Sequence, residues 1–204
     1  MSPLLEPTDI THLDGRLARS QRTRVAIVDA LIGLLEGGLV QPTVEDVAAR
    51  AGVAPRTVFQ HYPDRDALFV AVGRRRQPRL DALMGRLSAD GPVHERIDAV
   101  IEQRTRLYEW IAPVRRAALL MEPFSEAVHT ALEGLRAVKR EEAIRFFAAE
   151  IDAVPPGERA ELQAAVAAAL SWSSWDALRT QQGLDAEQAS AAMRRTLVAL
   201  LACR

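Results

Sequence analysis

The chain is predicted to be all-α, and its composition and its periodicity both support this fold class. Hydrophobic residues make up 49% of the 204 residues and aromatic residues only 5%, and alanine, leucine and valine dominate. Apolar residues recur at helical spacing in nearly every segment, and no run alternates convincingly as a half-buried strand would. We therefore expect closely packed helices, with an N-terminal three-helix domain and a larger C-terminal helical domain.

The N-terminal part is expected to begin with a flexible arm over residues 1–18. A helix follows over about residues 20–37, with a broad apolar inner face, and the pair Gly37-Gly38 ends it. Residues 19–66 are predicted to form one domain, which contains this helix and the two short helices that come next.

The run over residues 43–68 predicts a helix, a tight turn, a second helix and the start of a third. Thr43 precedes the apolar period and can cap the first of these helices, with Asp46 as its capping-box partner. Gly52 ends that helix, because glycine takes a left-handed backbone without strain. Val58 is expected to pack inward against the first helix. This is the helix-turn-helix pattern, whose second helix enters the major groove of DNA.

The second helix, about residues 54–61, carries side chains that can read DNA. Arginine can pair bidentately with guanine, glutamine with adenine, and a threonine methyl group can contact that of thymine. Phe59 is expected to face inward with Val58. The residues that follow can reach phosphates, and an arginine there lies in the first turn of the third helix, where free N–H groups attract phosphate. The predicted DNA-binding residues are Thr43, Pro55, Arg56, Thr57, Gln60, His61, Tyr62 and Arg65.

The segment GVAPRTVFQHYPDRDALF, residues 52–69, resembles the DNA-reading segment of the TetR (tetracycline-repressor) family of bacterial regulators. The resemblance includes the preceding helix, the glycine pair that ends it and Thr43, and covers about the first third of the chain. The family commonly has a small residue where this chain has Arg56, tyrosine at Phe59 and lysine at Arg65. The resemblance implies a dimeric regulator with a ligand cavity among its middle helices and a four-helix dimer interface near its C-terminus.

Charge is distributed unevenly along the chain, although the net charge is only −1. Residues 16–79 hold eleven arginines and six acidic residues, whereas residues 80–204 hold 15 basic and 18 acidic residues. The basic excess coincides with the helix-turn-helix, as a phosphate-binding surface requires. Contacts to the DNA backbone and a solvated or interdomain face both remain open for two sets of arginines: Arg16, Arg19, Arg22 and Arg24, and Arg74, Arg75, Arg76 and Arg79.

Residues 67–204 are predicted to form a helical domain for ligand binding and dimerisation. Prolines and one glycine divide this part of the chain, since proline is compatible with the first turn of a helix but disrupts its interior. The expected helices cover about residues 64–86, 93–110, 113–120, 124–152, 157–181 and 185–201.

The last two long helices are the expected dimer interface. Alanines on the first of them allow close approach, and tryptophans supply area of the kind enriched at interface centres. The alternative, that the tryptophans belong to the core of one subunit, stays open. The predicted interface residues are Trp172, Trp175, Met193 and Leu197.

A pocket for a small-molecule effector is expected in the middle region, where bulky side chains gather. Most of these side chains could equally be ordinary core. Because no cluster of basic residues stands out among them, we expect a neutral or weakly polar ligand, with few polar groups in the site. The predicted ligand-binding residues are Tyr108, Met121, Phe124, Phe147 and Trp172.

No pattern of a catalytic, cofactor or metal site is recognisable. The four histidines are scattered, there is no phosphate-binding glycine loop, and the single cysteine, Cys203, predicts neither an intramolecular disulfide nor a zinc site. We therefore expect a protein that is not an enzyme and binds neither cofactor nor metal. The first residues lack the pattern of a signal peptide, and no apolar run approaches the roughly 20 residues of a membrane span. The expected location is the cytoplasm, without a membrane partner.

These observations predict a ligand-responsive transcriptional regulator, most simply a repressor, that binds a palindromic double-stranded DNA operator as a homodimer. The alternative is a helical protein that binds a small molecule and carries a vestigial helix-turn-helix. DNA affinity that falls steeply with salt would separate the two.

Overall fold

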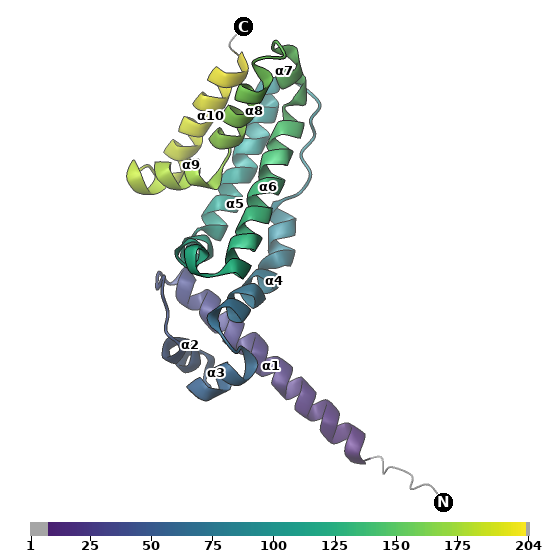
Figure 1. Ribbon diagram of the computed structural model, residues 1–204, viewed down its shortest axis with the longest axis vertical. Helices are drawn as coiled ribbons and strands as arrows, with labels where there is room; N and C mark the ends of the chain where they lie inside the picture. The colour runs from purple at the N-terminus through teal and green to yellow at the C-terminus, as the bar shows by residue number, and fades with distance from the viewer. Residues whose placement is uncertain (1–7, 203–204) are drawn as a thin grey trace, which may run out of the picture. The chain divides into compact units, whose positions relative to one another are not determined.

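The computed structural model describes the backbone of residues 8–202 and the side chains of residues 15–201. Every regular element in that part of the chain is helical, so the all-α prediction is confirmed (Figure 1). In chain order the elements are α1 (Thr8–Glu36), α2 (Val44–Ala51), α3 (Pro55–His61), α4 (Arg65–Leu83), α5 (Val93–Met121), the 3-10 turn η1 (Glu122–Phe124), α6 (Glu126–Phe146), α7 (Ala148–Ala153), α8 (Arg159–Ala169), α9 (Trp172–Asp176), the π-helical segment η2 (Ala177–Gln181) and α10 (Ala186–Ala202).

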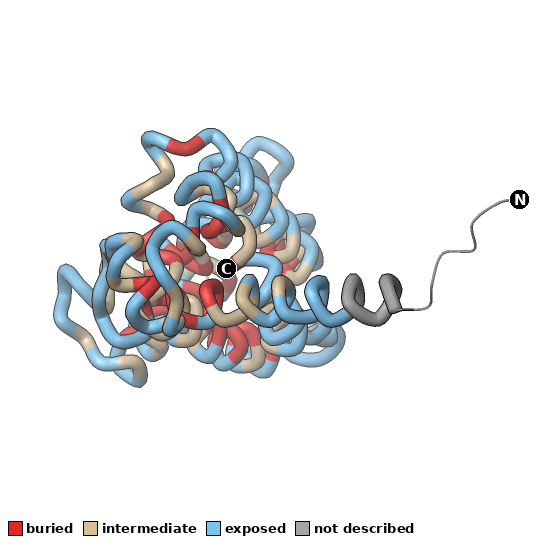
Figure 2. The backbone as a smooth tube through the Cα atoms, turned by 90° about the horizontal axis from the view of Figure 1, so that it is seen from below, coloured by how far each residue is buried: buried red, intermediate tan, exposed pale blue. Residues whose placement is uncertain are grey.

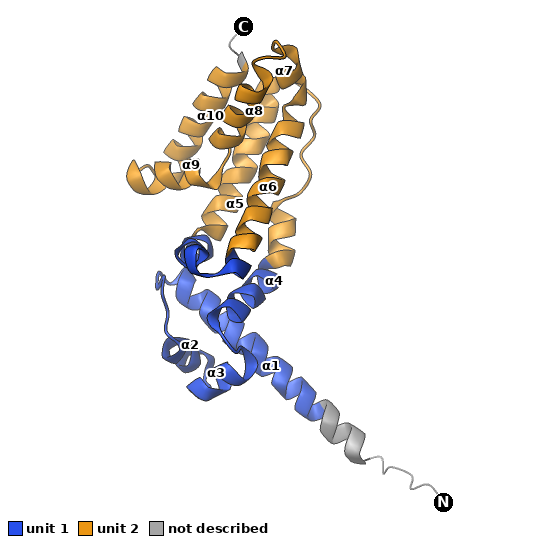
Figure 3. Cartoon of the chain, viewed as in Figure 1, with its two compact units in different colours: residues 1–76, 113–128 blue, residues 77–112, 129–204 orange. Residues whose placement is uncertain are grey.

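The chain divides into two compact units (Figure 3). Unit 1 consists of residues 1–76 and 113–128, and unit 2 of residues 77–112 and 129–204. Three helices, α4, α5 and α6, each contribute residues to both units. From the sequence, we expected the boundary between the two helical domains after residue 66. Unit 1 extends to residue 76 and also contains the end of α5, η1 and the first turn of α6.

Helix α1 supplies the core of unit 1. Ile27, Leu31 and Leu35 are almost fully buried on its inner face. The described side chains at its beginning, residues 15–24, are mostly exposed and appear pale blue in Figure 2. Residues 8–18, assigned by the sequence to a flexible arm, are helical, because no proline interrupts the first turns; residues 1–7 lie outside the described part of the chain.

Helix α4 continues through Pro78, so this proline does not end it. Two ion pairs join α4 to α1. Arg75 binds Asp29 through two nitrogens, at 2.8 and 3.1 Å, and Arg76 donates to Glu36 at 2.6 Å. Two of the arginines for which DNA contact was left open are therefore engaged within unit 1.

The core of unit 2 is built from α5 to α10. Large side chains from five helices are almost fully buried: Ile97, Leu107, Phe147, Ile151, Val166, Trp175 and Leu197. Helix α5 runs without a break through Pro113, where the sequence predicted two helices. The loss of one backbone donor at this proline is tolerated within a helix of 29 residues.

The second half of unit 2 is more divided than the sequence predicted. The helix expected over residues 124–152 is split at Phe147, whose backbone leaves the helical region, into α6 and α7. The helix expected over residues 157–181 ends at Leu170, and Ser171 caps a new helix, α9, with its hydroxyl accepting from the backbone N–H of Ser174 at 3.1 Å. Ion pairs fix two later elements to α5: Arg194 of α10 binds Asp98, and Arg179 of η2 binds Glu109.

Candidate nucleic-acid interface

The capping box predicted at the start of α2 is present. The Thr43 hydroxyl oxygen accepts a hydrogen bond from the backbone N–H of Asp46 at 3.1 Å. The Asp46 carboxylate accepts from both the backbone N–H and the hydroxyl of Thr43, at 2.8 and 2.7 Å. These hydrogen bonds lower the pKa of Asp46, the backbone N–H of Thr43 having the larger effect. The beginning of α2 is thus fixed by two residues that precede its first buried side chain, Val47.

The turn between α2 and α3 has the predicted glycine geometry. Gly52 adopts a left-handed backbone, with φ 68° and ψ 34°, and the N–H of the next residue, Val53, donates to the carbonyl oxygen of Ala48 at 3.0 Å. Pro55 occupies the first turn of α3, where its missing N–H has no cost. Val58 of α3 is buried beside α2, as expected. The turn and the packing together hold α3 in a fixed orientation on α2.

Helix α3 presents a polar face to solvent. Arg56 and Gln60 are exposed and Thr57 is half-buried, so the side-chain types that can read base edges share the outer side of one short helix. Pro55 is exposed at its beginning and His61 is half-buried at its end. Among the described side chains Arg56 has no ion-pair partner, which leaves its guanidinium free for another acceptor.

Two aromatic residues of this segment differ from the expectations. Phe59 is 55% exposed rather than inward, because Val58 already occupies the inner position and the next residue on a helix points about 100° away. Tyr62 was predicted to reach phosphate, but it is 5% exposed. Its hydroxyl donates to the backbone carbonyl of Arg24 at 3.2 Å, and the Arg24 guanidinium lies 5.1 Å from its ring centre. Tyr62 therefore joins α3 to α1 in the core of unit 1.

The first turn of α4 carries the predicted phosphate-binding arginine. Asp64 caps this helix, its carboxylate accepting from the N–H of Ala67 at 2.7 Å, a cap that the sequence analysis did not identify. The motif of Asp followed by a helical period could have revealed it. Arg65 is exposed and makes no ion pair within the described part of the chain. Its charge lies next to the free N–H groups of the helix beginning, a favourable position for a phosphate.

Residues 27–72 match the family model described as bacterial regulatory proteins, tetR family. The match covers the C-terminal part of α1, the whole helix-turn-helix and the beginning of α4. The N-terminal domain belongs to the tetR family. The resemblance seen in the sequence is thereby confirmed, and the TetR-type domain is a helix-turn-helix DNA-binding domain.

Solved structures share the fold over most of the chain. A transcriptional regulator from Rhodococcus sp. RHA1 is 18% identical, with a TM-score of 0.65, 90% of this chain and 96% of that chain being covered. NalD, the secondary repressor of the MexAB-OprM multidrug efflux pump in Pseudomonas aeruginosa, is 24% identical, with a TM-score of 0.53 and coverages of 88% and 97%. No curated protein sequence matches the chain significantly. The two structures show that the fold continues beyond the TetR-type domain.

We expect the substitution Asp46→Asn to lower the stability of the TetR-type domain at pH 7, because an amide is a weaker acceptor for the two donors of Thr43. The folded-state pKa of Asp46 is depressed, so its contribution is present above the ordinary carboxyl pKa, about 4, and is lost as pH falls through the folded value. Urea unfolding of both proteins between pH 7 and pH 3 checks this. The control is Glu45→Gln at the exposed neighbouring position, and an equal, pH-independent difference for both substitutions would contradict the expectation.

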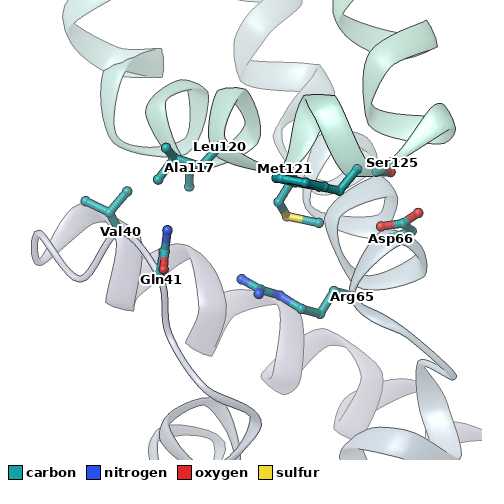
Figure 4. Close-up of a pocket in the computed structure, with 9 residues that line it drawn as sticks. Val40, Gln41, Arg65, Asp66, Ala117, Leu120, Met121 and Ser125 are labelled. Carbon is teal, nitrogen blue, oxygen red and sulfur yellow. The ribbon is translucent and has the colours of Figure 1, made fainter.

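The predicted ligand-binding residues fall into two separate groups. Met121 and Phe124 belong to unit 1, where they line a pocket of about 390 Å³ (Figure 4). The other lining residues are Val40, Gln41, Arg65, Asp66, Ala117, Leu120 and Ser125. In Figure 4 the Arg65 side chain extends below Met121 toward Gln41, so the candidate phosphate-binding group also borders this pocket. Phe124 is 89% exposed at its rim.

The remaining three predicted ligand-binding residues lie in the core of unit 2. Tyr108 meets Trp172 edge to face, with ring centres 5.7 Å apart, and its hydroxyl donates to the carbonyl of Leu170 at 2.5 Å. Phe147 is fully buried and packs against Phe146 with ring centres 5.0 Å apart. Tyr108 and Trp172 are thus brought together, whereas Met121 and Phe124 are not part of the same unit.

The structure corrects the predicted dimer interface. Trp172, Trp175, Met193 and Leu197 are between 0 and 8% exposed within one chain. Trp172 and Trp175 pack against Tyr108 of α5, and Met193 and Leu197 are buried on α10, so these side chains belong to the core of one chain and are not presented on its surface. The apolar side of α10 carries Met193 and Leu197, as predicted, but these residues are buried within their own chain.

In the part of the chain that the structure describes, no helix is long and apolar enough to cross a membrane. No group of three or more histidine, cysteine, aspartate or glutamate side chains is arranged there to hold a metal ion.

Proposed function

We propose that this protein is a ligand-responsive transcriptional regulator that binds a palindromic DNA operator as a homodimer and represses transcription. Its proposed location is the cytoplasm. The observation that supports this function most strongly is the outer face of α3, where Arg56, Thr57 and Gln60 stand on a helix fixed by the capped helix α2 and the Gly52 turn. NalD is described as a repressor, and this likeness supports repression as the direction of control.

Base reading is assigned to Arg56 and Gln60, with Thr57 beside them. Arg56 lies in the first turn of α3, the end of a recognition helix that contacts base edges. An arginine there suits guanine, which presents two acceptors in the major groove, and Gln60, one turn later, suits adenine. Thr57 is half-buried beside them, and its methyl group can contact the methyl group of a thymine.

Phosphate binding is assigned to residues around the recognition helix. His61 ends α3 and Arg65 follows it in the first turn of α4. Thr43 stands at the capped beginning of α2, and because its hydroxyl and N–H both donate to Asp46, a phosphate there would have to take the place of that carboxylate. Arg16, Arg19 and Arg22 are exposed on α1 and have no ion-pair partner among the described side chains, so they extend the same positive surface. Such contacts position the protein and do not select sequence.

Dimerisation is assigned to exposed faces of α8 and α10, which are neighbours in unit 2. On α8, Ala160, Ala164 and Ala168 are exposed at intervals of four residues, and on α10, Ala191 and Ala199 share an exposed side. Small side chains let helices of two subunits approach closely. A two-fold axis at this face would pair two recognition helices for half-sites one DNA turn, about 34–36 Å, or a multiple of it apart.

Control by ligand requires only that the effector and DNA prefer different conformations of the dimer. Helix α5 provides a continuous connection, because its residues 93–112 belong to unit 2 and its residues 113–121 to unit 1. The end of α5 carries Met121, which borders the same pocket as Arg65. A shift of α5 caused by a ligand would thus change the surroundings of a phosphate-binding side chain.

We expect Arg56→Ala to weaken operator binding by about 1–3 kcal/mol and to relax the preference at one base position. Arg65→Ala should weaken binding to all sequences alike and lower the slope of log K against log salt by about 1. Binding profiles on a library of operator variants, each measured at several salt concentrations, distinguish the two effects. Arg140→Ala is the control, since Arg140 is exposed on α6 of unit 2.

An unchanged base preference for Arg56→Ala would remove this residue from the recognition surface. Binding of the native protein that is weak, independent of sequence and insensitive to salt would favour the alternative, a ligand-binding helical protein whose helix-turn-helix has lost its function.

A further inference from the structure

A buried arginine in the middle of α5 lacks most of the hydrogen bonds it requires. Arg104 is 2% exposed. Its Nη2 is 3.5 Å from Oε2 of Glu142, the outer limit of a hydrogen bond, and its Nε and Nη1 have no partner among the described residues. The guanidinium is planar, permanently charged and carries five N–H donors, so it is poorly satisfied at this position.

By contrast, another buried arginine of α5 has a hydrogen-bond partner for every nitrogen of its guanidinium. Arg96 is 6% exposed, and its nitrogens donate to the carbonyls of Gly91 and Phe146, at 3.2 and 3.0 Å, and to Glu150. A buried donor without a partner has lost its hydrogen bonds to water without replacing them, which destabilises the folded state, and more so when the group is charged. The difference between Arg96 and Arg104 therefore indicates that Arg104 serves something other than the fold.

A second positively charged side chain binds the carboxylate of Glu142. Lys139 of α6 donates to Oε2 of Glu142 at 2.6 Å, and its side chain is 18% exposed. Burial lowers the pKa of Lys139, and the nearby positive charge of Arg104 lowers it further. One carboxylate thus faces two cations, which leaves a surplus positive charge inside unit 2.

We infer that unit 2 binds a small organic acid, whose carboxylate accepts hydrogen bonds from Arg104 and balances the charge shared with Lys139. A carboxylate matches the guanidinium better than a neutral acceptor, because its two oxygens can accept two parallel N–H bonds and its charge offsets that of the arginine. A buried water could satisfy a donor but could not balance the charge.

The surroundings of Arg104 indicate the rest of the ligand. Tyr108 lies one helical turn further along the same face of α5, and its ring packs against Trp172. Leu107 of α5 and Ala143, which follows Glu142 on α6, are both buried. These apolar and aromatic residues suit a ligand in which an aromatic ring or an aliphatic chain is joined to the carboxylate. The sequence alone favoured a neutral ligand, because it could not show that Arg104 is buried with too few partners.

This inference deepens the proposed function by naming the chemical class of the effector, and it rests on that function only for the effect on DNA. The test uses the full-length protein and measures its melting temperature with benzoate and octanoate, and with the neutral amides benzamide and octanamide at equal concentration. The two acids should raise the melting temperature by several degrees and the amides should not.

Arg104→Met should abolish the response to the acids. Without ligand it should melt at the same or a higher temperature than the native protein, because an under-paired buried charge has been replaced by an apolar side chain of similar length. Arg106→Met is the matched control: this arginine is exposed two positions away on α5 and pairs with Glu102, so the response should persist. If Arg104→Met does not fold, Lys139→Met carries the same test and should weaken the response.

Absence of a shift with both acids, or equal shifts with the amides, would overturn the inference. So would a response that survives in both Arg104→Met and Lys139→Met. Operator binding, measured separately without acid, should be unchanged in Arg104→Met and should no longer respond to the acids. A native protein that binds the acids but no DNA would contradict the proposed function while leaving the acid site in place.

Discussion

Replacing Leu197 by aspartate is expected to unfold unit 2. Leu197 is 0% exposed, and its neighbours in the core include Met193, one turn away on α10 at 2% exposure. The substitution removes a buried apolar side chain and places a charged carboxylate in a site that is closed to water, so we expect a loss of more than about 3 kcal/mol. Circular dichroism and thermal unfolding should show a large loss of cooperative structure.

Thr196→Asp is the control for this prediction. Thr196 is exposed on the same helix, and its hydroxyl bonds only to the carbonyl of Ala192 at 3.0 Å. This variant should keep nearly native stability. A Leu197→Asp protein that stays fully helical and melts cooperatively as a monomer would instead return Leu197 to the subunit interface.

Ala164→Arg is expected to give a folded protein that no longer dimerises. Ala164 is exposed in the middle of the alanine face of α8, so the larger side chain has room in a single chain but would prevent close approach of a second one. Loss of the second half-site should weaken operator binding by about 100-fold or more, since linked sites commonly gain 10²–10⁴ in affinity. Sedimentation at micromolar concentration and operator titration measure the two effects.

Ala149→Arg, at an exposed position of α7, serves as the control and should remain a dimer with native affinity. If Ala164→Arg still sediments as a dimer, the interface lies on another face. If it becomes a monomer but binds the operator as tightly as before, two recognition helices are not required.

The helix-turn-helix could be predicted because its signals are local. A capping residue, its acidic partner three positions on and a left-handed glycine each determine the backbone over a few residues, and all three are found as expected. Their agreement over about 20 residues identified both the motif and the outward face of α3. Tyr62 was misplaced because its role depends on a hydrogen bond to α1, 38 residues away, which no local pattern contains.

The C-terminal part was harder to predict because its features depend on packing. An apolar stripe such as Met193 and Leu197 has the same sequence pattern whether its partner is a neighbouring helix or another subunit, and only burial within one chain decides. Proline was read as a helix break at Pro113, although a long packed helix tolerates one lost donor. The under-paired Arg104 is equally invisible in the sequence, since it differs from the paired Arg96 only in what lies opposite.

The central claim is that α3 reads DNA sequence, and selection from random duplex DNA with the purified native protein tests it most directly. Enrichment of one palindromic sequence, bound with an affinity that falls steeply with salt, is the result expected from paired recognition helices carrying Arg56 and Gln60. Selection that enriches no sequence, with binding too weak to detect at low salt, would contradict it.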